Sequence, residues 1–334
     1  MKKIAIIGAG SWGTALAIVL SQSPRAHRIS MWVHSADVAQ TLLSRRVNDI
    51  YLPGFILPEG IEIGRDFAAA VDGADYVLGV MPSAHAGDVY SGLLPHLRPE
   101  IPIISATKGI ETGNLLRMSE VIRETVGVKF PPRVVVLSGP SFAREVAQAE
   151  PTALVIAADD VALAAEVQEE FSGPSLRLYT NTDVAGVEFG GAFKNVISLT
   201  AGVAQGLGLG HNAQAALITR GLAEMARLGV VLGAHRETFV GLAGLGDLVL
   251  TCTGKLSRNR AVGIELGRGR KLPEILASTR MVAEGVSTTA AVWTLAQRLA
   301  ISMPITEQMH AVLYENRPPR DAIRELMSRP LKNE

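Results

Sequence analysis

A glycine-rich string near the start of the chain limits the fold more than any other feature: Gly8-Ala9-Gly10-Ser11-Trp12-Gly13. It follows an apolar run at residues 3–7 that is typical of a strand, and it precedes a stretch at residues 14–21 that is typical of a helix. In that position glycines permit a tight turn, a close approach of the backbone to a pyrophosphate, and contact between helix and strand. The free N–H groups that begin the helix add a partial positive charge. The string therefore predicts a dinucleotide site formed by Gly8, Gly10, Ser11, Trp12 and Gly13, with a purely structural glycine turn as the alternative.

The first half of the chain alternates short apolar runs with amphipathic or Ala-rich stretches, which is the pattern of βαβ units. Nearly unbroken apolar strands are typical of a sheet that helices cover on both faces. The pattern predicts an α/β fold with a Rossmann-like, doubly wound, mainly parallel sheet. We expect strands at residues 3–7, 29–33, 76–80, 101–106, 134–137, 152–157 and 176–179, and helices at 14–21, 66–71, 115–126 and 161–171. The segment 45–64, with Pro53, Gly54, Pro58 and Gly60, is interpreted as a long surface loop.

After about residue 183 the β-rich runs stop and helical spacing takes over, as in the set Val292, Leu295, Ala296 and Leu299. A chain of 334 residues also exceeds the size at which one core usually suffices. We expect an NAD(P)-binding Rossmann domain at residues 1–185 and an all-α C-terminal domain, which carries the substrate and catalytic groups, at 186–334. The uncharged stretch 195–219 is long enough to span a bilayer, but its glycines and polar residues favour a buried helix pair joined near residues 208–210.

Composition excludes some classes of function. Lys plus Arg (32) balance Asp plus Glu (32), so no overall field favours nucleic acid or an anionic membrane. The single cysteine, Cys252, excludes an intrachain disulfide framework and favours the cytoplasm. The apolar start resembles a secretory signal, but glycines interrupt it. The histidines lack ligand spacing, so no metal is predicted.

The second predicted strand bears on the choice of dinucleotide. An Asp or Glu about 20 residues beyond the glycines would bind the ribose 2′-hydroxyl of NAD. This chain has His34 there and no acid before Asp37. Because a carboxylate would repel a 2′-phosphate, its absence favours NADP(H) over NAD(H), which stays possible; an exposed loop histidine is the alternative. Two later strands end near His85, interpreted as an ordinary loop histidine, and Lys108, placed to meet an anionic ligand.

Several strings together resemble the NAD(P)-dependent glycerol-3-phosphate dehydrogenase family, especially its bacterial members. The resemblance extends from the first residue to about residue 314. It implies a cytoplasmic oxidoreductase that reversibly reduces dihydroxyacetone phosphate to sn-glycerol 3-phosphate, the backbone of glycerophospholipids. Besides residues 8–13, the strings are Ala106-Thr107-Lys108-Gly109, Leu137-Ser138-Gly139-Pro140-Ser141-Phe142-Ala143, Gly190-Gly191-Ala192-Phe193-Lys194-Asn195-Val196, Gly241-Leu242-Ala243-Gly244-Leu245-Gly246-Asp247-Leu248, Thr251-Cys252-Thr253, Ser257-Arg258-Asn259 and Val282-Ala283-Glu284-Gly285.

Two charged residues in apolar strings are candidates for the chemistry. We expect Lys194 to open a helical segment and to have a pKa lowered by desolvation, as a general acid for carbonyl reduction requires. Asp247 would be costly to bury without a cationic partner. The resemblance assigns proton transfer to Lys194 and suggests that Asp247 orients it or the substrate hydroxyl, with Asn195 and Thr251 completing the polar lining. The alternatives are a structural lysine and a helix N-cap aspartate.

The string Ser257-Arg258-Asn259 offers a guanidinium fork, a hydroxyl and an amide, which suit a phosphate dianion, particularly if Arg258 begins a helix. A solvated helix start is the alternative. The resemblance adds substrate contacts at Lys108, Gly139 and Ser141. It also implies cofactor contacts, with Lys108 among the expected residues: Lys108, Ala143, Arg258, Val282 and Glu284.

Two other functions stay open at this point. A β-hydroxyacid or 6-phosphogluconate type dehydrogenase would share a Rossmann domain followed by a helical domain. A non-catalytic NAD(P)-sensing regulator is also possible, because a fold does not fix a function. We expect a small-molecule substrate, no nucleic acid, no membrane insertion and, given the apolar helical half, a homodimer.

Overall fold

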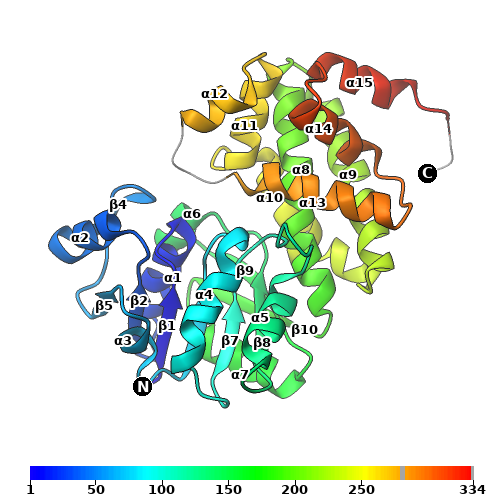
Figure 1. Cartoon of the computed structure of the whole chain (residues 1–334). Helices are drawn as coiled ribbons and strands as arrows, with labels where there is room; N and C mark the ends of the chain where they lie inside the picture. Colours follow the sequence, from blue (N-terminus) through cyan, green and yellow to red (C-terminus); the bar gives the residue numbers. More distant parts are fainter. Residues whose placement is uncertain (279–282, 332–334) are drawn as a thin grey trace. The chain divides into compact units, whose positions relative to one another are not determined.

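The computed structural model describes residues 1–278 and 283–331. The chain divides into two compact units (Figure 1). The first unit comprises Met1–Glu111 with Leu116–Glu188, and the second comprises Thr112–Leu115 with Phe189–Glu334.

The first unit contains a sheet whose strand order is β10-β9-β8-β7-β6-β1-β2-β5. All neighbouring strands are parallel except β8 and β9. This confirms the mainly parallel, doubly wound sheet, and every predicted strand is present within two residues at its ends. The strands are β1 (Lys3–Ile7), β2 (Arg28–Trp32), β5 (Ile61–Gly64), β6 (Tyr76–Gly79), β7 (Pro102–Ser105), β8 (Arg133–Ser138), β9 (Thr152–Ala157) and β10 (Leu176–Asn181).

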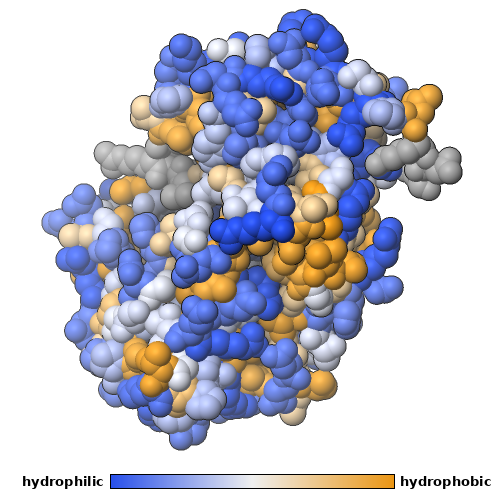
Figure 2. All heavy atoms as spheres, turned by 45° about the vertical axis from the view of Figure 1, so that its right-hand side comes forward, coloured by the Kyte–Doolittle hydropathy of each residue, from blue (hydrophilic) through white to orange (hydrophobic). Residues whose placement is uncertain are grey.

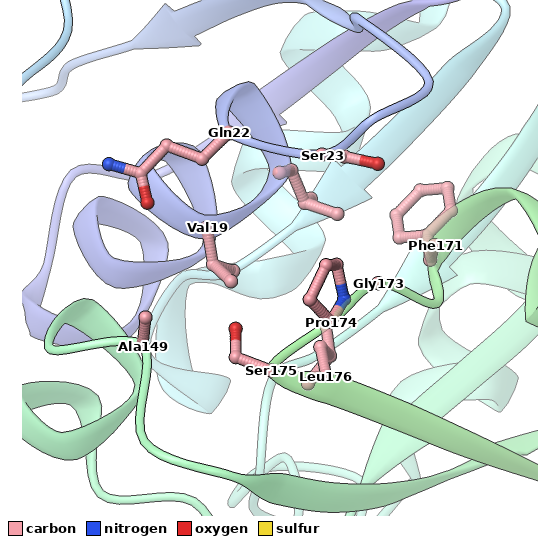
Figure 3. Close-up of a pocket in the computed structure, with 10 residues that line it drawn as sticks. Val19, Gln22, Ser23, Ala149, Phe171, Gly173, Pro174, Ser175 and Leu176 are labelled. Atoms are coloured by element: carbon pink, nitrogen blue, oxygen red, sulfur yellow. The ribbon is translucent and has the colours of Figure 1, made fainter.

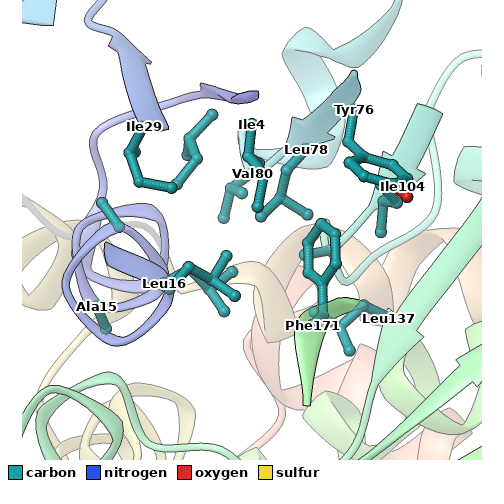
Figure 4. Close-up of a cluster of buried hydrophobic side chains, with 14 of the residues drawn as sticks. Ile4, Ala15, Leu16, Ile29, Tyr76, Leu78, Val80, Ile104, Leu137 and Phe171 are labelled. Carbon is teal, nitrogen blue, oxygen red and sulfur yellow. The ribbon is translucent and has the colours of Figure 1, made fainter. Parts of the chain in front are cut away.

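Two apolar clusters pack on the opposite faces of this sheet. Successive strand side chains alternate between faces, so Ile4 and Ile6 of β1 join one cluster while Ala5 and Ile7 join the other. Figure 4 shows the first cluster, where Leu16 and Phe171 meet the strand side chains. Burial on both faces explains the unbroken apolar runs. One face is covered by α1 (Ser11–Ser21), α2 (Ala36–Arg45), α6 (Ala143–Ala147) and α7 (Val161–Phe171), and the other by α3 (Phe67–Val71), α4 (Ala86–Leu93) and α5 (Met118–Gly127), with 3₁₀ turns at Ser83–His85 and Leu94–His96.

The prediction of a surface loop at residues 45–64 is wrong. The segment forms a small antiparallel hairpin of β3 (Val47–Asn48) and β4 (Leu52–Ile56), and β5 then joins the main sheet beside β2. Its prolines and glycines obscured the apolar pattern of Leu52, Leu57 and Ile61 in the sequence. Each of these residues is at most 4% exposed. These side chains bury enough apolar surface to order the segment against the core.

All the regular secondary structure in the described residues of the second unit is helical, which confirms the predicted all-α half. The uncharged stretch forms two helices, α8 and α9, joined at residues 207–210, as predicted. None of the helices within 1–278 and 283–331 has the length and apolar content that crossing a bilayer requires. The helices are α8 (Val184–Gly206), which begins in the last residues of the first unit, α9 (His211–Val231), α10 (Asp247–Thr253), α11 (Arg258–Gly267), α12 (Leu272–Ala277), α13 (Glu284–Arg298), α14 (Pro304–Tyr314) and α15 (Pro319–Ser328), with shorter turns at Arg236–Val240 and Leu242–Gly246.

Glycines bring α8 and α11 into backbone contact. A Cβ at Gly202 would lie 2.2 Å from the carbonyl oxygen of Arg260, and one at Gly263 would lie 2.0 Å from that of Leu199. Side chains at these positions would force the helices apart. The close approach brings the start of α11, with its predicted phosphate-binding residues, against α8, which carries Lys194 and Asn195.

Candidate functional site

The glycines of residues 8–13, here called the glycine turn, have distinct structural roles. Gly8 has a φ of +125°, and a Cβ there would lie 2.3 Å from the carbonyl oxygen of Val80. A Cβ at Gly13 would lie 2.0 Å from the carbonyl oxygen of Gly8, whereas one at Gly10 would meet nothing within 4 Å. Gly8 and Gly13 therefore make the turn possible, and Gly10 leaves space for a ligand to approach the backbone. This geometry fits a dinucleotide pyrophosphate.

Helix α1 begins directly from the glycine turn, with Gly10 as its N-cap. Its first turn contains no acidic residue, so nothing offsets the partial positive charge of the free N–H groups. The Ser11 hydroxyl donates a hydrogen bond to the carbonyl oxygen of Tyr51 at 2.6 Å. The Trp12 indole nitrogen is buried and has no hydrogen-bond partner among the described residues.

The other predicted residues of the first unit follow the carboxyl ends of parallel strands, the edge where such sheets bind ligands. His34 is exposed just beyond β2, and Lys108 follows β7. The Lys108 ammonium donates to the carbonyl oxygen of Gly139 at 2.7 Å and to the Ser141 hydroxyl at 3.4 Å. Ala143 is the first residue of α6. The structure thus brings Lys108, Gly139 and Ser141 together at one edge, where the Lys108 ammonium contributes a positive charge.

Lys194 lies in the middle of α8, so the expectation that it opens a helix is wrong. Its side chain is buried, and its ammonium forms a hydrogen-bonded ion pair with the Asp247 carboxylate. The ammonium also donates to the Thr251 hydroxyl at 3.0 Å, and that hydroxyl donates to the Asp247 carbonyl oxygen at 2.6 Å. We call Lys194, Asp247 and Thr251 the lysine cluster. The cationic partner that the sequence required for Asp247 is Lys194.

Close helix packing forms the lysine cluster. A Cβ at Gly190 would lie 2.5 Å from the carbonyl oxygen of Ala243, so α8 passes very near the segment that leads into α10. Asp247 is the first residue of α10 and is 1% exposed. A buried charge is tolerated when it is paired and hydrogen-bonded. A lysine held in this way can exchange a proton with a bound oxygen atom.

Cys252 follows the lysine cluster directly but has a different character. Its side chain is completely buried, and burial raises the pKa of the thiol to about 12. A thiol with such a pKa is protonated at neutral pH and is a poor nucleophile. Cys252 is therefore not a candidate nucleophile.

The three side chains of the predicted phosphate-binding string, residues 257–259, differ in whether other helices already bind them. Ser257 caps α11 by accepting a hydrogen bond from Arg260 N–H at 3.2 Å, and its hydroxyl also meets that of Ser198 at 3.0 Å. The Asn259 amide donates to the Asn195 side-chain oxygen at 2.9 Å and accepts from Gly285 N–H at 2.9 Å. Both side chains therefore join helices. Arg258 is the first residue of α11, which meets the condition that the sequence analysis set for its phosphate role, and the residue as a whole is exposed.

Two expected cofactor contacts precede or begin α13. Glu284 is its first residue, and its carboxylate lies near Arg258. Although Arg258 as a whole is exposed, the groups around its guanidinium desolvate it and lower its pKa, and the nearby Glu284 carboxylate partly offsets that effect. Val282 lies outside the described residues.

A separate pocket of about 280 Å³ lies in the first unit. It is lined by the last turns of α1, including Val19 and Leu20, and by the chain around Pro174 that leads into β10 (Figure 3). No charged side chain lines it. It lies at the opposite end of α1 from the glycine turn and offers nothing to bind phosphate.

Sequence reasoning missed two residues that support these sites. Asn48 is buried beside the glycine turn, inside the segment interpreted as a loop. Ser198 lies one helical turn after Lys194 and donates to the Thr251 carbonyl oxygen at 3.1 Å. The spacing of Ser198 from Lys194 on one helix could have identified it; nothing in the local sequence indicated Asn48.

Two family models match the chain. The N-terminal model of NAD-dependent glycerol-3-phosphate dehydrogenase matches residues 3–164, and the C-terminal model matches residues 183–324. The chain belongs to the NAD-dependent glycerol-3-phosphate dehydrogenase family.

Individual relatives in this family match nearly the whole chain. Glycerol-3-phosphate dehydrogenase [NAD(P)+] of Koribacter versatilis is 54% identical over 335 residues, covering 100% of this chain and 99% of the relative. The enzyme of the same name from Syntrophotalea carbinolica is 51% identical and covers 99% of each chain. The crystal structure of glycerol-3-phosphate dehydrogenase from Coxiella burnetii is similar with a TM-score of 0.93 and 40% identity, covering 98% of this chain and 99% of that one. The resemblance predicted from the motifs is therefore confirmed.

Proposed function

We propose that this protein is an sn-glycerol-3-phosphate dehydrogenase that uses NAD(P)H to reduce dihydroxyacetone phosphate reversibly. The observation that carries the proposal is the buried lysine cluster, because its ion pair has the groups that carbonyl reduction needs. Relatives named for this reaction match the chain from end to end. In this proposal residues 1–185 form the NAD(P)-binding Rossmann domain, and residues 186–334 form the helical domain that carries the catalytic groups and completes the dinucleotide site.

The lysine cluster performs the proton transfer in this proposal. The chemistry that bound NAD(P)H supplies is a hydride for the carbonyl carbon. The carbonyl oxygen then gains negative charge, which the Lys194 ammonium stabilises and neutralises by giving a proton. Asp247 and Thr251 hold the Lys194 nitrogen in one place, so little reorganisation is required. In the oxidative direction the neutral amine of Lys194 accepts the proton of the alcohol.

The remaining predicted residues receive binding roles. We assign the substrate phosphate to Arg258, supported by the N–H groups that begin α11 and by the free second amide hydrogen of Asn259. Ser257 and Asn195 contribute by holding this region in place. Lys108, Gly139 and Ser141 form a second anion-binding group for the ligands. The dinucleotide is assigned to Gly8, Gly10, Ser11, Trp12, Gly13, His34, Lys108, Ala143, Arg258, Val282 and Glu284.

The proposal includes a preference for NADPH over NADH. It is supported by the exposed His34 beyond β2 and by the absence of a carboxylate in residues 33–36, which directly follow that strand. The test is the ratio of kcat/KM for NADPH to that for NADH. A ratio at or below one would contradict the preference.

We also propose that the protein works in the cytoplasm as a homodimer. Its single buried cysteine suits a reducing compartment. Figure 2 shows one face of the molecule, mostly hydrophilic, with hydrophobic side chains gathered in places. The exposed apolar residues of the second unit, which support the proposed dimer, include Leu209, Val230, Val231, Val240 and Val249. Analytical ultracentrifugation tests the dimer.

The reaction itself is tested by steady-state oxidation of NADPH with a panel of ketones. We expect turnover with dihydroxyacetone phosphate and much slower turnover with dihydroxyacetone, which lacks the phosphate. A β-hydroxyacid dehydrogenase would instead prefer β-keto acids. Turnover with a β-keto acid but none with dihydroxyacetone phosphate would overturn the proposed substrate.

A further inference from the structure

Asn48 lies beside the glycine turn on an element that the sequence did not reveal. It is the second residue of β3 and pairs with Leu52 in the small hairpin with β4. Asn48 is only 1% exposed. Burying an amide is costly unless its hydrogen bonds are made. The partners of Asn48 therefore indicate why an asparagine is there.

The amide of Asn48 has a partner for each of its polar atoms. Its nitrogen donates to the carbonyl oxygen of Ala9 at 2.8 Å and to the hydroxyl of Thr14 at 2.8 Å. Its oxygen accepts a hydrogen bond from Tyr51 N–H at 3.1 Å. Ala9 lies within the glycine turn, and Thr14, which is completely buried, lies in the first turn of α1. Asn48 thus ties both the glycine turn and the first turn of α1 to the hairpin.

The bond to Ala9 fixes the direction of the next N–H group. In a trans peptide the carbonyl oxygen and the following N–H point to opposite sides, and the Ala9–Gly10 peptide is trans like every described peptide bond. With the Ala9 carbonyl directed at Asn48, the Gly10 N–H points away from the hairpin. The Ser11 hydroxyl also donates a hydrogen bond to this hairpin, at the carbonyl oxygen of Tyr51. These contacts hold the turn in one conformation before any ligand arrives.

We propose that Asn48 is a positioning residue that preorganises the glycine turn for the pyrophosphate of the dinucleotide. This inference rests on the proposed function, because it requires a dinucleotide at residues 8–13. A turn that is already fixed loses less conformational freedom on binding, so the affinity is higher. Since NADPH and NADH share the pyrophosphate, loss of Asn48 weakens both by the same factor.

The experiment measures the dissociation constants of NADPH and NADH by fluorescence titration of the full-length protein. Asn48→Asp keeps the shape and the acceptor for Tyr51 but places a carboxylate against the Ala9 carbonyl oxygen. We expect both dissociation constants to rise about tenfold or more. Thr14→Val removes only the second acceptor of Asn48, and we expect a rise of about threefold. In steady-state kinetics the KM for the dinucleotide rises, while the KM for dihydroxyacetone phosphate and the kcat at saturating NADPH change little.

Two matched control variants should leave the dinucleotide affinity unchanged. Asp49→Asn changes an exposed neighbour in the same hairpin, and Thr14→Ser keeps the hydroxyl; both should retain wild-type affinity. Thermal unfolding separates stability from binding. A variant that melts earlier but binds both dinucleotides like the wild type would show a merely structural asparagine and overturn the inference.

Two further outcomes are distinguishable. Unequal weakening of NADPH and NADH would place Asn48 at the ribose and also overturn the inference. If the wild type itself binds neither dinucleotide, both the proposed function and the inference about Asn48 fail. If Asn48→Asp does not fold, the comparison of Thr14→Val with Thr14→Ser decides, and equal affinities of those two would contradict the proposal.

Discussion

The glycine turn and the lysine cluster solve opposite problems. The glycine turn offers an anion a bare backbone with space at Gly10, and it has no charged side chain in residues 8–13. The lysine cluster buries two full charges, Lys194 and Asp247, and satisfies them with each other and with Thr251. One site depends on side chains being absent, and the other on side chains being present and paired. Substitutions should therefore damage them in different ways.

The largest effect is expected at Lys194. Lys194→Ala removes the proton donor, so kcat should fall by about 10³-fold. The glycine turn belongs to the first unit and is unchanged, so NADPH affinity should stay within about twofold of the wild type. Stopped-flow kinetics gives the first quantity and fluorescence titration the second. Undiminished turnover would remove Lys194 from the mechanism.

The next effect is on stability and concerns Asp247. Asp247→Asn leaves the buried Lys194 ammonium without its carboxylate, which should lower the free energy of unfolding by about 3 kcal/mol. Urea denaturation measures it. The double variant Lys194→Met with Asp247→Leu replaces the pair by apolar groups and should recover most of that stability while staying inactive. If the double variant is less stable than Asp247→Asn, the ion pair stabilises the fold more than this account allows.

The two sites also differ in how far sequence alone could predict them. The glycine turn is a local string between a strand and a helix, so its residues, its strand and its helix could all be predicted together. The lysine cluster joins residues separated by 53 positions in the sequence. An apolar context indicated that Asp247 needed a cation, and the family resemblance singled out Lys194. That Lys194 lies in mid-helix depended on the continuity of α8, which Gly190 and Gly191 obscured.

The features that sequence missed share a physical cause. Asn48 acts through contacts with residues 39 and 34 positions away, and no local propensity encodes them. Its hairpin is ordered by a few buried apolar residues scattered among prolines and glycines, which read as a loop in any short window. Likewise, Ser257 and Asn259 hydrogen-bond to neighbouring helices only because α8, α11 and α13 pack together.

A smaller effect is expected from alanine in the glycine turn. Gly10→Ala adds a methyl group in open space, so the protein should keep its stability while NADPH binding weakens about tenfold. Gly13→Ala instead collides with the Gly8 backbone and should lower the melting temperature as well as the affinity. Calorimetry and titration on both variants make the comparison. Equal losses of stability would contradict the separate roles of these glycines.

The smallest effect concerns a buried charge of the second unit that lies outside the lysine cluster. Glu224, on α9, is 3% exposed, and its carboxylate accepts hydrogen bonds from the N–H groups of Ile305 and Thr306 at the start of α14. Burial raises its pKa from 4.5 to about 7, and these hydrogen bonds only partly oppose the shift. Between those pH values the folded state holds a proton that the unfolded state releases. Its contribution to stability therefore falls as pH rises from about 4.5 to 7 and then levels off.

Glu224→Gln removes this titration and keeps an acceptor for Ile305. The free energy of unfolding of the wild type, relative to the variant, should therefore decline by about 1–3 kcal/mol between pH 4.5 and 7.5. Urea denaturation at a series of pH values measures the difference, which cancels the titration of all other groups. The variant should keep its kcat, because Glu224 caps a helix and touches none of the lysine cluster. A flat difference would show an unshifted carboxylate, and a large loss of kcat would show that the buried charges of this unit act as one network.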